Sequence, residues 1–277
     1  MVSPWMRAVI VSASSDIGVA LGRRWCAAGH VVVGTYRTRA PAVTELEAAG
    51  ASLVPCDLAD PESVRRAGAA LRALCPEWDV LVVAGGTLDP VEAFADCDVE
   101  AWAAAVDVNF TSQMRVVHAL LPVRRVGAVP GPLVLFFAGG GANDAPVGSS
   151  AYTVAKIALT KMCELLAAEV ADTRFVILGP GWVRTKIHDA ILRAGTRAGA
   201  RYERTREKLA SHDCTPMADV LDCCDWLVGA APEVVTGRNF SVAHDRWGSV
   251  ALADLLRGDA HLYKLRRAGN ACLPREE

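Results

Sequence analysis

The chain has 277 residues, 52% of them hydrophobic, and a formal net charge of −2 at pH 7. This length and composition suit one α/β domain with a large core and require no second domain. The near-neutral charge gives no electrostatic reason to expect nucleic acid or an anionic membrane as a partner, so a small-molecule substrate is expected. No apolar run approaches the ~18 residues of a membrane span, and the first residues lead into a strand and not a signal peptide, so we expect a cytoplasmic protein.

The first strand and helix have the pattern of a dinucleotide-binding unit. An apolar run from Ala8 to Val11 is followed by small polar residues and then by a helical pattern from Val19 to Ala28. Small residues let the backbone approach a pyrophosphate, and unpaired N–H groups at the helix start favour its negative charge. The alternative is a Ser/Asp-capped turn that binds no ligand.

Apolar runs then alternate with helical patterns along the chain. Expected strands are residues 31–34, the residues before Cys56, 79–83, the run that contains Phe136, 175–181 and 236–243. This alternation predicts one doubly wound Rossmann domain with a mainly parallel sheet flanked by helices, over residues 1–247. Residues 248–277 are expected to be a C-terminal extension with an amphipathic run from Val250 to Leu256.

Tyr152 and Lys156 lie four residues apart in a helical pattern, a spacing that stacks a phenol over an ammonium. An unperturbed Tyr ionises near pH ~10, so lowering its pKa to ~7 takes about 4 kcal/mol of differential stabilisation. A close Lys and a cationic nicotinamide can supply it. The pair predicts a proton-transfer device, although by itself it is also compatible with a solvated helix face.

Together and in this order, the segments resemble the short-chain dehydrogenase/reductase family over roughly residues 6 to 245. The first loop of that family reads Thr-Gly-x-x-x-Gly-Ile-Gly; Ile17 and Gly18 match it, whereas Ser12 and Asp16 occupy the first two glycine places. The resemblance implies cofactor contacts at Ser12, Ser14, Ser15, Asp16, Ile17, Gly18, Asp57, Leu58, Gly85, Tyr152, Lys156, Pro180, Gly181, Val183 and Thr185.

The same resemblance implies an oxidoreductase that interconverts a carbonyl and a secondary alcohol. Tyr152 would be the acid/base, Lys156 would lower its pKa and hold the nicotinamide ribose, and Asn109 would support a water in a proton relay. A small polar substrate is expected, with a sugar or cyclitol derivative as the favoured class. Relatives are often oligomers, so a homodimer or homotetramer is expected.

One departure from the family concerns the substrate oxygen. Relatives carry a Ser thirteen residues before the Tyr, and that position is Gly139 here. Losing a comparable oxyanion donor costs roughly 10²–10³ in rate. Asn143, Ser149 or backbone N–H groups of the glycine run are candidate replacements. Gly139 and Gly140 are expected to border the substrate, or else to form a flexible turn.

Cofactor choice depends on the end of the second strand. No carboxylate stands there to accept a ribose 2′-OH, and Arg37 follows, with Arg39 two residues on. A guanidinium suits a 2′-phosphate, so NADP is favoured over NAD, with Arg37 as its contact.

The segment 186–217 is expected to form a substrate lid. Its basic and aromatic residues are Arg193, Arg197, Arg201, Tyr202, Arg204, Arg206 and Lys208. They suit a phosphate, nucleotide or carboxylate on the substrate, or else a solvated helix face with salt-bridge partners. His188 is expected near the cleft mouth, at the substrate or on the surface.

Two other functions stay open. An epimerase or dehydratase with a tightly bound cofactor is compatible with the missing Ser, and a non-catalytic NADP(H)-sensing protein is compatible with the altered glycines. Nine Cys, an odd number without Cys-x-x-Cys spacing, favour reduced thiols over disulfides or zinc. The six His show no metal-ligand spacing, so no metal site is expected.

Overall fold

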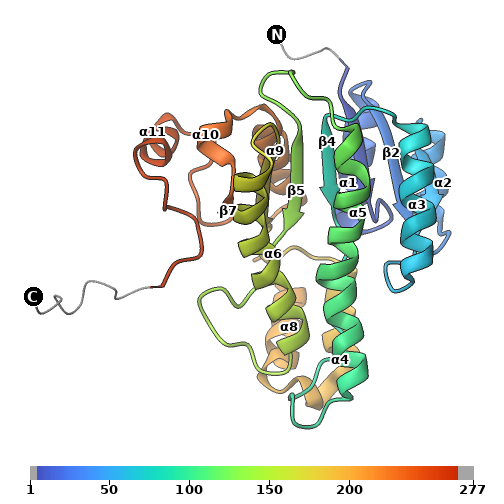
Figure 1. The fold of residues 1–277 in the computed structure, drawn as a ribbon. Helices are drawn as coiled ribbons and strands as arrows, with labels where there is room; N and C mark the ends of the chain where they lie inside the picture. The colour runs from blue at the N-terminus through green and yellow to red at the C-terminus, as the bar shows by residue number, and fades with distance from the viewer. Residues whose placement is uncertain (1–4, 212, 268–277) are drawn as a thin grey trace, which may run out of the picture.

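The computed structural model describes residues 5–211 and 213–267. Seven strands form one parallel sheet in the order β3-β2-β1-β4-β5-β6-β7 (Figure 1). The strands are β1 Arg7–Val11, β2 Val31–Tyr36, β3 Ser52–Pro55, β4 Val80–Val83, β5 Leu133–Phe137, β6 Arg174–Gly179 and β7 Arg238–Ser241. The strand order reverses between β1 and β4, which makes the sheet doubly wound. The predicted Rossmann fold is therefore confirmed.

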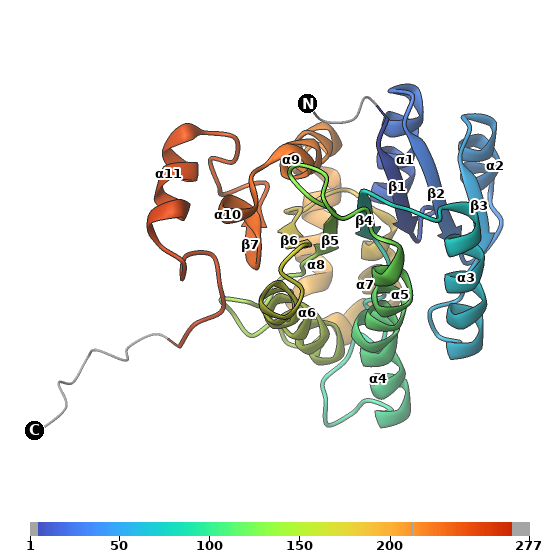
Figure 2. The ribbon, with the colours of Figure 1, turned by 45° about the horizontal axis from the view of Figure 1, so that its top comes forward.

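Helices cover both faces of this sheet (Figure 2). They are α1 Asp16–Ala27, α2 Pro41–Ala48, α3 Pro61–Leu74, α4 Val99–Val106, α5 Ser112–Leu120, α6 Ser150–Glu169, α7 Asp189–Ala194, α8 Ala200–Ala210, α9 Met217–Gly229, α10 Pro232–Val235 and α11 Val250–Gly258. Along β1, Ala8 and Ile10 join the core beneath α1, α2 and α9, whereas Val9 and Val11 join the core beneath α3, α5 and α6. Both faces are apolar because both are covered.

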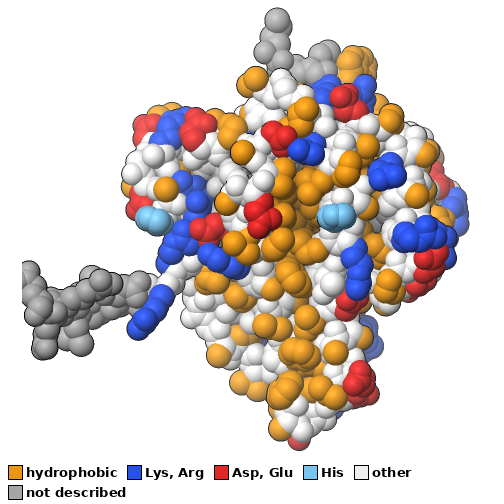
Figure 3. Space-filling model, in the orientation of Figure 1, with side chains coloured by type: hydrophobic (Ala, Val, Ile, Leu, Met, Phe, Trp, Pro, Cys, Tyr) orange, Lys and Arg blue, Asp and Glu red, His pale blue; other side chains and the backbone are white. Residues whose placement is uncertain are grey.

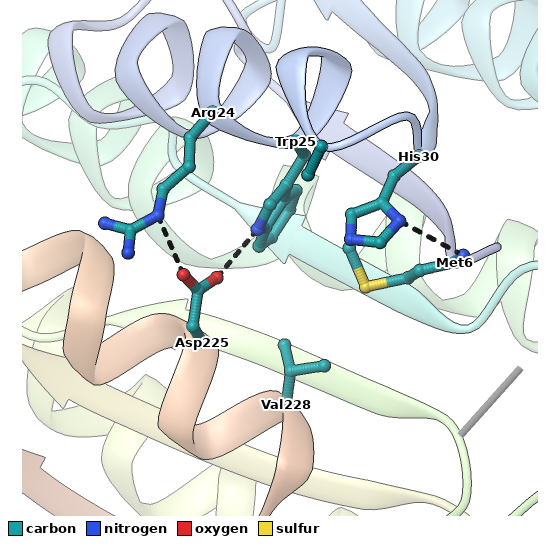
Figure 4. Close-up of a pocket in the computed structure, with 7 residues that line it drawn as sticks. Met6, Arg24, Trp25, His30, Asp225 and Val228 are labelled. Carbon is teal, nitrogen blue, oxygen red and sulfur yellow. Dashed lines mark hydrogen bonds and ion pairs between the residues drawn. The ribbon is translucent and has the colours of Figure 1, made fainter. Parts of the chain in front are cut away.

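Helices α1 and α9 are joined at the amino edge of the sheet. The carboxylate of Asp225 accepts a hydrogen bond from Trp25 Nε1 at 2.8 Å and pairs with Arg24 Nε at 2.8 Å (Figure 4). These side chains line a cavity of about 220 Å³ with Met6 and His30, which directly precede β1 and β2. This cavity therefore lies at the opposite edge of the sheet from the carboxyl ends of the strands.

A buried arginine fixes the start of β6. Arg174 is 3% exposed and donates hydrogen bonds to the carbonyls of Gly131, Leu227 and Ala230. Burial lowers the pKa of its guanidinium to about 10. These bonds connect the loop before β5 and the end of α9 to the sheet.

The described part of the C-terminal extension packs on the same sheet. The run from Val250 to Leu256 lies within α11, and Ser249 caps this helix by accepting a hydrogen bond from Leu252 N at 3.2 Å. Beyond it, the Tyr263 carbonyl accepts from Asn239 N, and Arg266 pairs with Glu164 of α6. The rest of the extension, residues 268–277, lies outside the described residues.

Candidate active site

Tyr152 and Lys156 lie on one face of α6, in its first two turns. Lys156 is 3% exposed, its Nζ donates to the carbonyl of Phe137 at 2.9 Å, and it lies 5.7 Å from the centre of the Tyr152 ring. Phe137 ends β5, so the pair lies at the carboxyl edge of the sheet, where doubly wound folds bind ligands.

Burial shifts both pKa values away from the charged forms. It raises the pKa of Tyr152 to about 12, against an opposing contribution from the Arg201 charge, and lowers the pKa of Lys156 to about 8. The protein's own groups thus keep the phenol protonated, ready to act as an acid. The lower Tyr152 pKa that the sequence predicts stays a prediction for the complex with a cationic cofactor.

The absence of a side chain at Gly139 leaves room for the Tyr152 ring. A Cβ built on Gly139 would lie 2.7 Å from Tyr152 Oη and 2.8 Å from Cζ, well inside van der Waals contact. A Cβ on the next residue, Gly140, would meet nothing within 4 Å. The close approach at Gly139 is therefore made by Tyr152 itself.

Asn109 supports the loop after β4 from a π-helical turn, Asp107–Thr111, between α4 and α5. It is fully buried; its Oδ1 accepts from Thr87 N at 3.0 Å, and its Nδ2 donates to the carbonyls of Thr87 and Ala105, both at 2.9 Å. A Cβ on Gly86 would lie 3.0 Å from Asn109 Oδ1 and 3.8 Å from Lys156 Nζ. Asn109 is thus near Lys156, and its side-chain donors connect the loop, at Thr87, to α4, at Ala105.

The loop between β1 and α1 keeps its glycine-like shape without the first glycine. Ser12 has φ 60°, the left-handed region that favours glycine, and its N–H donates to Thr35 Oγ1 at 2.8 Å. Ser15 caps α1 by accepting from Gly18 N at 3.1 Å. A Cβ on Gly18 would lie 2.6 Å from the Ser12 carbonyl, so glycine is required there.

The N-terminus of α1 has N–H donors that could bind a phosphate. Among the described residues, the N–H groups of Asp16 and Ile17 have no hydrogen-bond acceptor, and half-buried Ser14 stands beside them. The Asp16 carboxylate accepts from Lys186 N at 2.7 Å and lies 3.5 Å from Lys186 Nζ. It is thereby partly neutralised, which limits its repulsion of an anion.

Arg37 and Arg39, which follow β2, differ in whether another side chain pairs with them. Arg39 pairs with Glu47 and lies over the Tyr36 ring at 5.7 Å. Arg37 is exposed and forms no hydrogen bond or ion pair with the described residues. Of the two, Arg37 is the one available for a phosphate.

Residues that follow β1, β3 and β4 meet beside the loop between β1 and α1. A Cβ on Gly85 would lie 2.7 Å from both Leu58 Cδ1 and Ser12 Oγ. Leu58 is buried, and the preceding Asp57 accepts from Ala59 N at 3.0 Å. The structure therefore brings these predicted cofactor residues together.

The segment after β6 borders a second cavity. Pro180 and Gly181 follow the strand, and Gly181 has φ 77° and faces Thr215 so closely that a Cβ would collide with it. Val183 is buried, and its carbonyl accepts from Thr185 Oγ1 at 3.5 Å. A cavity of about 400 Å³ is lined by Val183, Arg184, Cys214, Thr215, Pro216 and Met217.

His188 follows this segment and is half-buried. Its ring stacks on Trp182 with centroids 4.1 Å apart, and its Nε2 is 2.9 Å from the Val183 carbonyl. Burial lowers the pKa of His188, and the Arg201 charge lowers it further. Of the other predicted substrate residues, Asn143 is exposed and forms no hydrogen bond with the described residues.

Most basic residues of the 186–217 segment have acidic partners. Their ion pairs are Arg193 with Asp89, Arg197 with Glu92, Arg206 with Glu203 and Lys208 with Asp213. Arg201 is different, because it is half-buried and pairs with no described carboxylate. The sequence does not distinguish Arg201 from the other arginines of the segment, because only the packing of α8 determines which arginine side chain is half-buried.

Within the described residues, no group of His, Cys, Asp and Glu side chains could hold a metal ion. No described helix combines the length and apolarity that crossing a bilayer takes.

Comparisons with known proteins find relatives among oxidoreductases. Residues 11–244 match the family model described as enoyl-(acyl carrier protein) reductase. The chain is similar to 1-deoxy-11-beta-hydroxypentalenate dehydrogenase of Streptomyces exfoliatus, with 30% identity over 64% of this chain and 67% of the relative. It is 28% identical to an uncharacterised oxidoreductase of Schizosaccharomyces pombe, of which it spans only 44%, over 41% of its own length.

The fold resembles a solved structure as well. A single-substitution variant of the actinorhodin polyketide ketoreductase, solved with NADPH, superposes with a TM-score of 0.73 over 87% of this chain and 97% of that chain, at 21% identity.

Proposed function

We propose that this chain, which belongs to the short-chain dehydrogenase/reductase family, is an NADP-dependent enzyme that interconverts a carbonyl and a secondary alcohol. The observation that carries the proposal is the pairing of Tyr152 with buried Lys156 at the carboxyl edge of the sheet, 5.7 Å from ammonium to ring centre. Its substrate is small and polar, with a sugar or cyclitol derivative as the class that the sequence favours. The 186–217 segment is its proposed lid.

Each residue contributes position or a proton. When bound, the cofactor supplies the hydride. Tyr152 donates its proton to the substrate oxygen in reduction and takes it back in oxidation. Lys156, with a pKa of about 8, is mainly protonated at neutral pH, so it places a positive charge beside the phenol and would hold the nicotinamide ribose when the cofactor is bound. Asn109 positions the loop that borders Lys156 and supports a relay water.

The preference for NADP rests on Arg37. Its guanidinium directly follows β2 and has no partner among the described residues, while no carboxylate ends the strand. The ketoreductase that shares the fold was solved with NADPH, which supports the same choice.

A homodimer or homotetramer is supported by an apolar surface. Figure 3 shows hydrophobic side chains gathered along the middle of one face, over α5 and α6 as labelled in Figure 1. Val99 of α4 and Val154 and Leu165 of α6 are among the exposed large hydrophobics. Light scattering of the purified chain measures the oligomeric state.

The test of the function is Tyr152→Phe, with NADPH oxidation followed on a panel of small carbonyl compounds. Loss of nearly all turnover is expected, with NADPH affinity within about threefold of wild type because the other expected cofactor contacts remain. Tyr202→Phe, in the same apolar cluster, is the matched control and should keep its turnover. Retained turnover in Tyr152→Phe would exclude the mechanism.

One alternative has an observation in its favour. Since Gly139 offers no hydroxyl, an epimerase or dehydratase that oxidises its substrate transiently is a second candidate. Cofactor that stays bound through gel filtration and is not consumed during turnover would favour it.

A further inference from the structure

Arg201 carries an unneutralised positive charge beside the candidate active site. It lies on α8, is half-buried, and its Nη1 is buried without a hydrogen-bond acceptor. Burying a charge without a partner costs free energy, because water that solvated it is lost and nothing replaces that water. Buried polar groups usually have a hydrogen-bond partner, so an anionic ligand would satisfy Arg201.

The groups that face Arg201 come from two other elements. Its charge acts on Tyr152 of α6, where it opposes the rise in pKa caused by burial, and on His188, whose pKa it lowers. Neither neighbour is an anion at neutral pH, since burial holds the phenol protonated. Among the described residues, therefore, the surroundings of Arg201 supply no counter-charge.

An apolar cluster packs against Tyr152, whose pKa the charge of Arg201 affects. Leu88 and Val91 from the loop after β4 pack with Ala190, Ile191 and Ala198, and Tyr152 and Tyr202 lie against them. A carbon skeleton would be in contact with these side chains, while a charged end would need Arg201.

We propose that Arg201 binds a carboxylate of the substrate, so that the substrates are small oxo acids or sugar acids whose reacting carbon lies at Tyr152. The location of that carbon rests on the function proposed above. A guanidinium presents two parallel N–H donors that match a carboxylate. Arg193, Arg197, Arg206 and Lys208 are already paired with carboxylates, and Arg204 is exposed. Among the described residues of this segment, Arg201 is the half-buried guanidinium that pairs with no carboxylate.

The test compares carboxylates with their primary amides, which have the same shape without the charge. Oxo acids and sugar acids of about three to seven carbons are assayed for kcat/KM with NADPH, and for equilibrium binding by calorimetry. Wild type should favour the acid by about 10- to 100-fold, and Arg201→Gln should reduce this ratio to near one with little change for the amide. Arg201→Lys should restore part of the preference.

Arg204→Gln is the matched control, because Arg204 lies on the same helix, is exposed and loses the same charge. It should keep the wild-type preference for the acid. An acid-to-amide ratio near one in wild type, or a ratio that Arg201→Gln leaves unchanged, would overturn the proposal.

The two readouts separate this inference from the proposed function. Turnover of neutral carbonyls without Arg201-dependent binding of carboxylates would refute the carboxylate site and leave the oxidoreductase intact. Arg201-dependent binding of carboxylates without turnover of any carbonyl would refute the function and leave the site intact.

Discussion

Gly139→Ser, which introduces the Ser that the family resemblance leads one to expect at this position, should reduce activity in this chain. The new Cβ would lie 2.7 Å from Tyr152 Oη and 2.8 Å from Cζ, where ordinary contact begins at 3.4 Å, so the ring must withdraw by at least about 0.7 Å. Misplacing a catalytic group by ~1 Å can cost about 10²-fold in rate. We expect turnover to fall between about 10- and 100-fold.

The assay is NADPH oxidation with any carbonyl compound that wild type reduces, beside thermal unfolding. Overpacking costs about 1–3 kcal/mol, which lowers the Tm of a chain this long by roughly 2–10 °C. Gly140→Ser is the matched control, because its Cβ meets nothing within 4 Å and neither glycine has a left-handed φ. Equal or faster turnover by Gly139→Ser would refute the reasoning, since the hydroxyl would then fit beside Tyr152.

Three further variants probe the cofactor site, the buried lysine and the fold. Arg37→Glu should weaken NADPH binding by about 10- to 100-fold relative to NADH binding, because a charge-assisted contact is lost. Arg39→Glu should change the NADPH/NADH ratio of affinities little. Equal changes of this ratio in the two variants would mean that Arg37 does not bind the 2′-phosphate. Burial lowers the pKa of Lys156 from 10.5 to about 8. Between pH 8 and pH 10.5, Lys156 is therefore protonated in the unfolded chain and neutral in the native state. The free energy of unfolding therefore gains up to about 3 kcal/mol as pH rises from 8 to 10.5. Urea titrations should show this gain reduced in Lys156→Met, and an unchanged slope would contradict the burial of an ionisable amine. Arg174→Ala strands three carbonyls and should cost at least about 3 kcal/mol of unfolding free energy in urea, whereas a loss below about 1 kcal/mol would mean that water replaces the guanidinium.

The fold was predictable because its signals are local and repeated. Apolar runs such as Ala8 to Val11 are short and continuous, as strands covered on both faces must be, and helical patterns separate them. The last strand is shorter than expected, because the chain is still turning at Gly237, where φ is 73°.

The site was predictable as a set of positions and not as a set of contacts. The spacing of Tyr152 and Lys156 already places them on one helix face. Nothing in the spacing shows that Gly139 holds the Tyr152 ring, because that contact joins the end of one strand to a helix thirteen residues later.

The arginines show the same limit. Sequence analysis left a charged substrate and a solvated, paired helix face as equal interpretations of the 186–217 segment. The structure supports pairing for Arg193, Arg197 and Arg206, yet leaves Arg201 half-buried and without a described carboxylate. Which arginine turns inward depends on how α8 packs against Tyr152, and local sequence does not determine that packing.

The most direct measurement is a separate titration of the purified chain with NADPH and with NADH, followed by quenching of its seven Trp residues. Ser12, with φ 60°, and Asp16 lie in the loop that would hold the pyrophosphate, so binding tests whether this loop accepts the cofactor. We expect micromolar NADPH binding and NADH binding at least about tenfold weaker, because only NADPH carries the ribose 2′-phosphate that Arg37 would contact. Binding of neither nucleotide would contradict the proposed function, since Tyr152 and Lys156 would then have no hydride donor to serve.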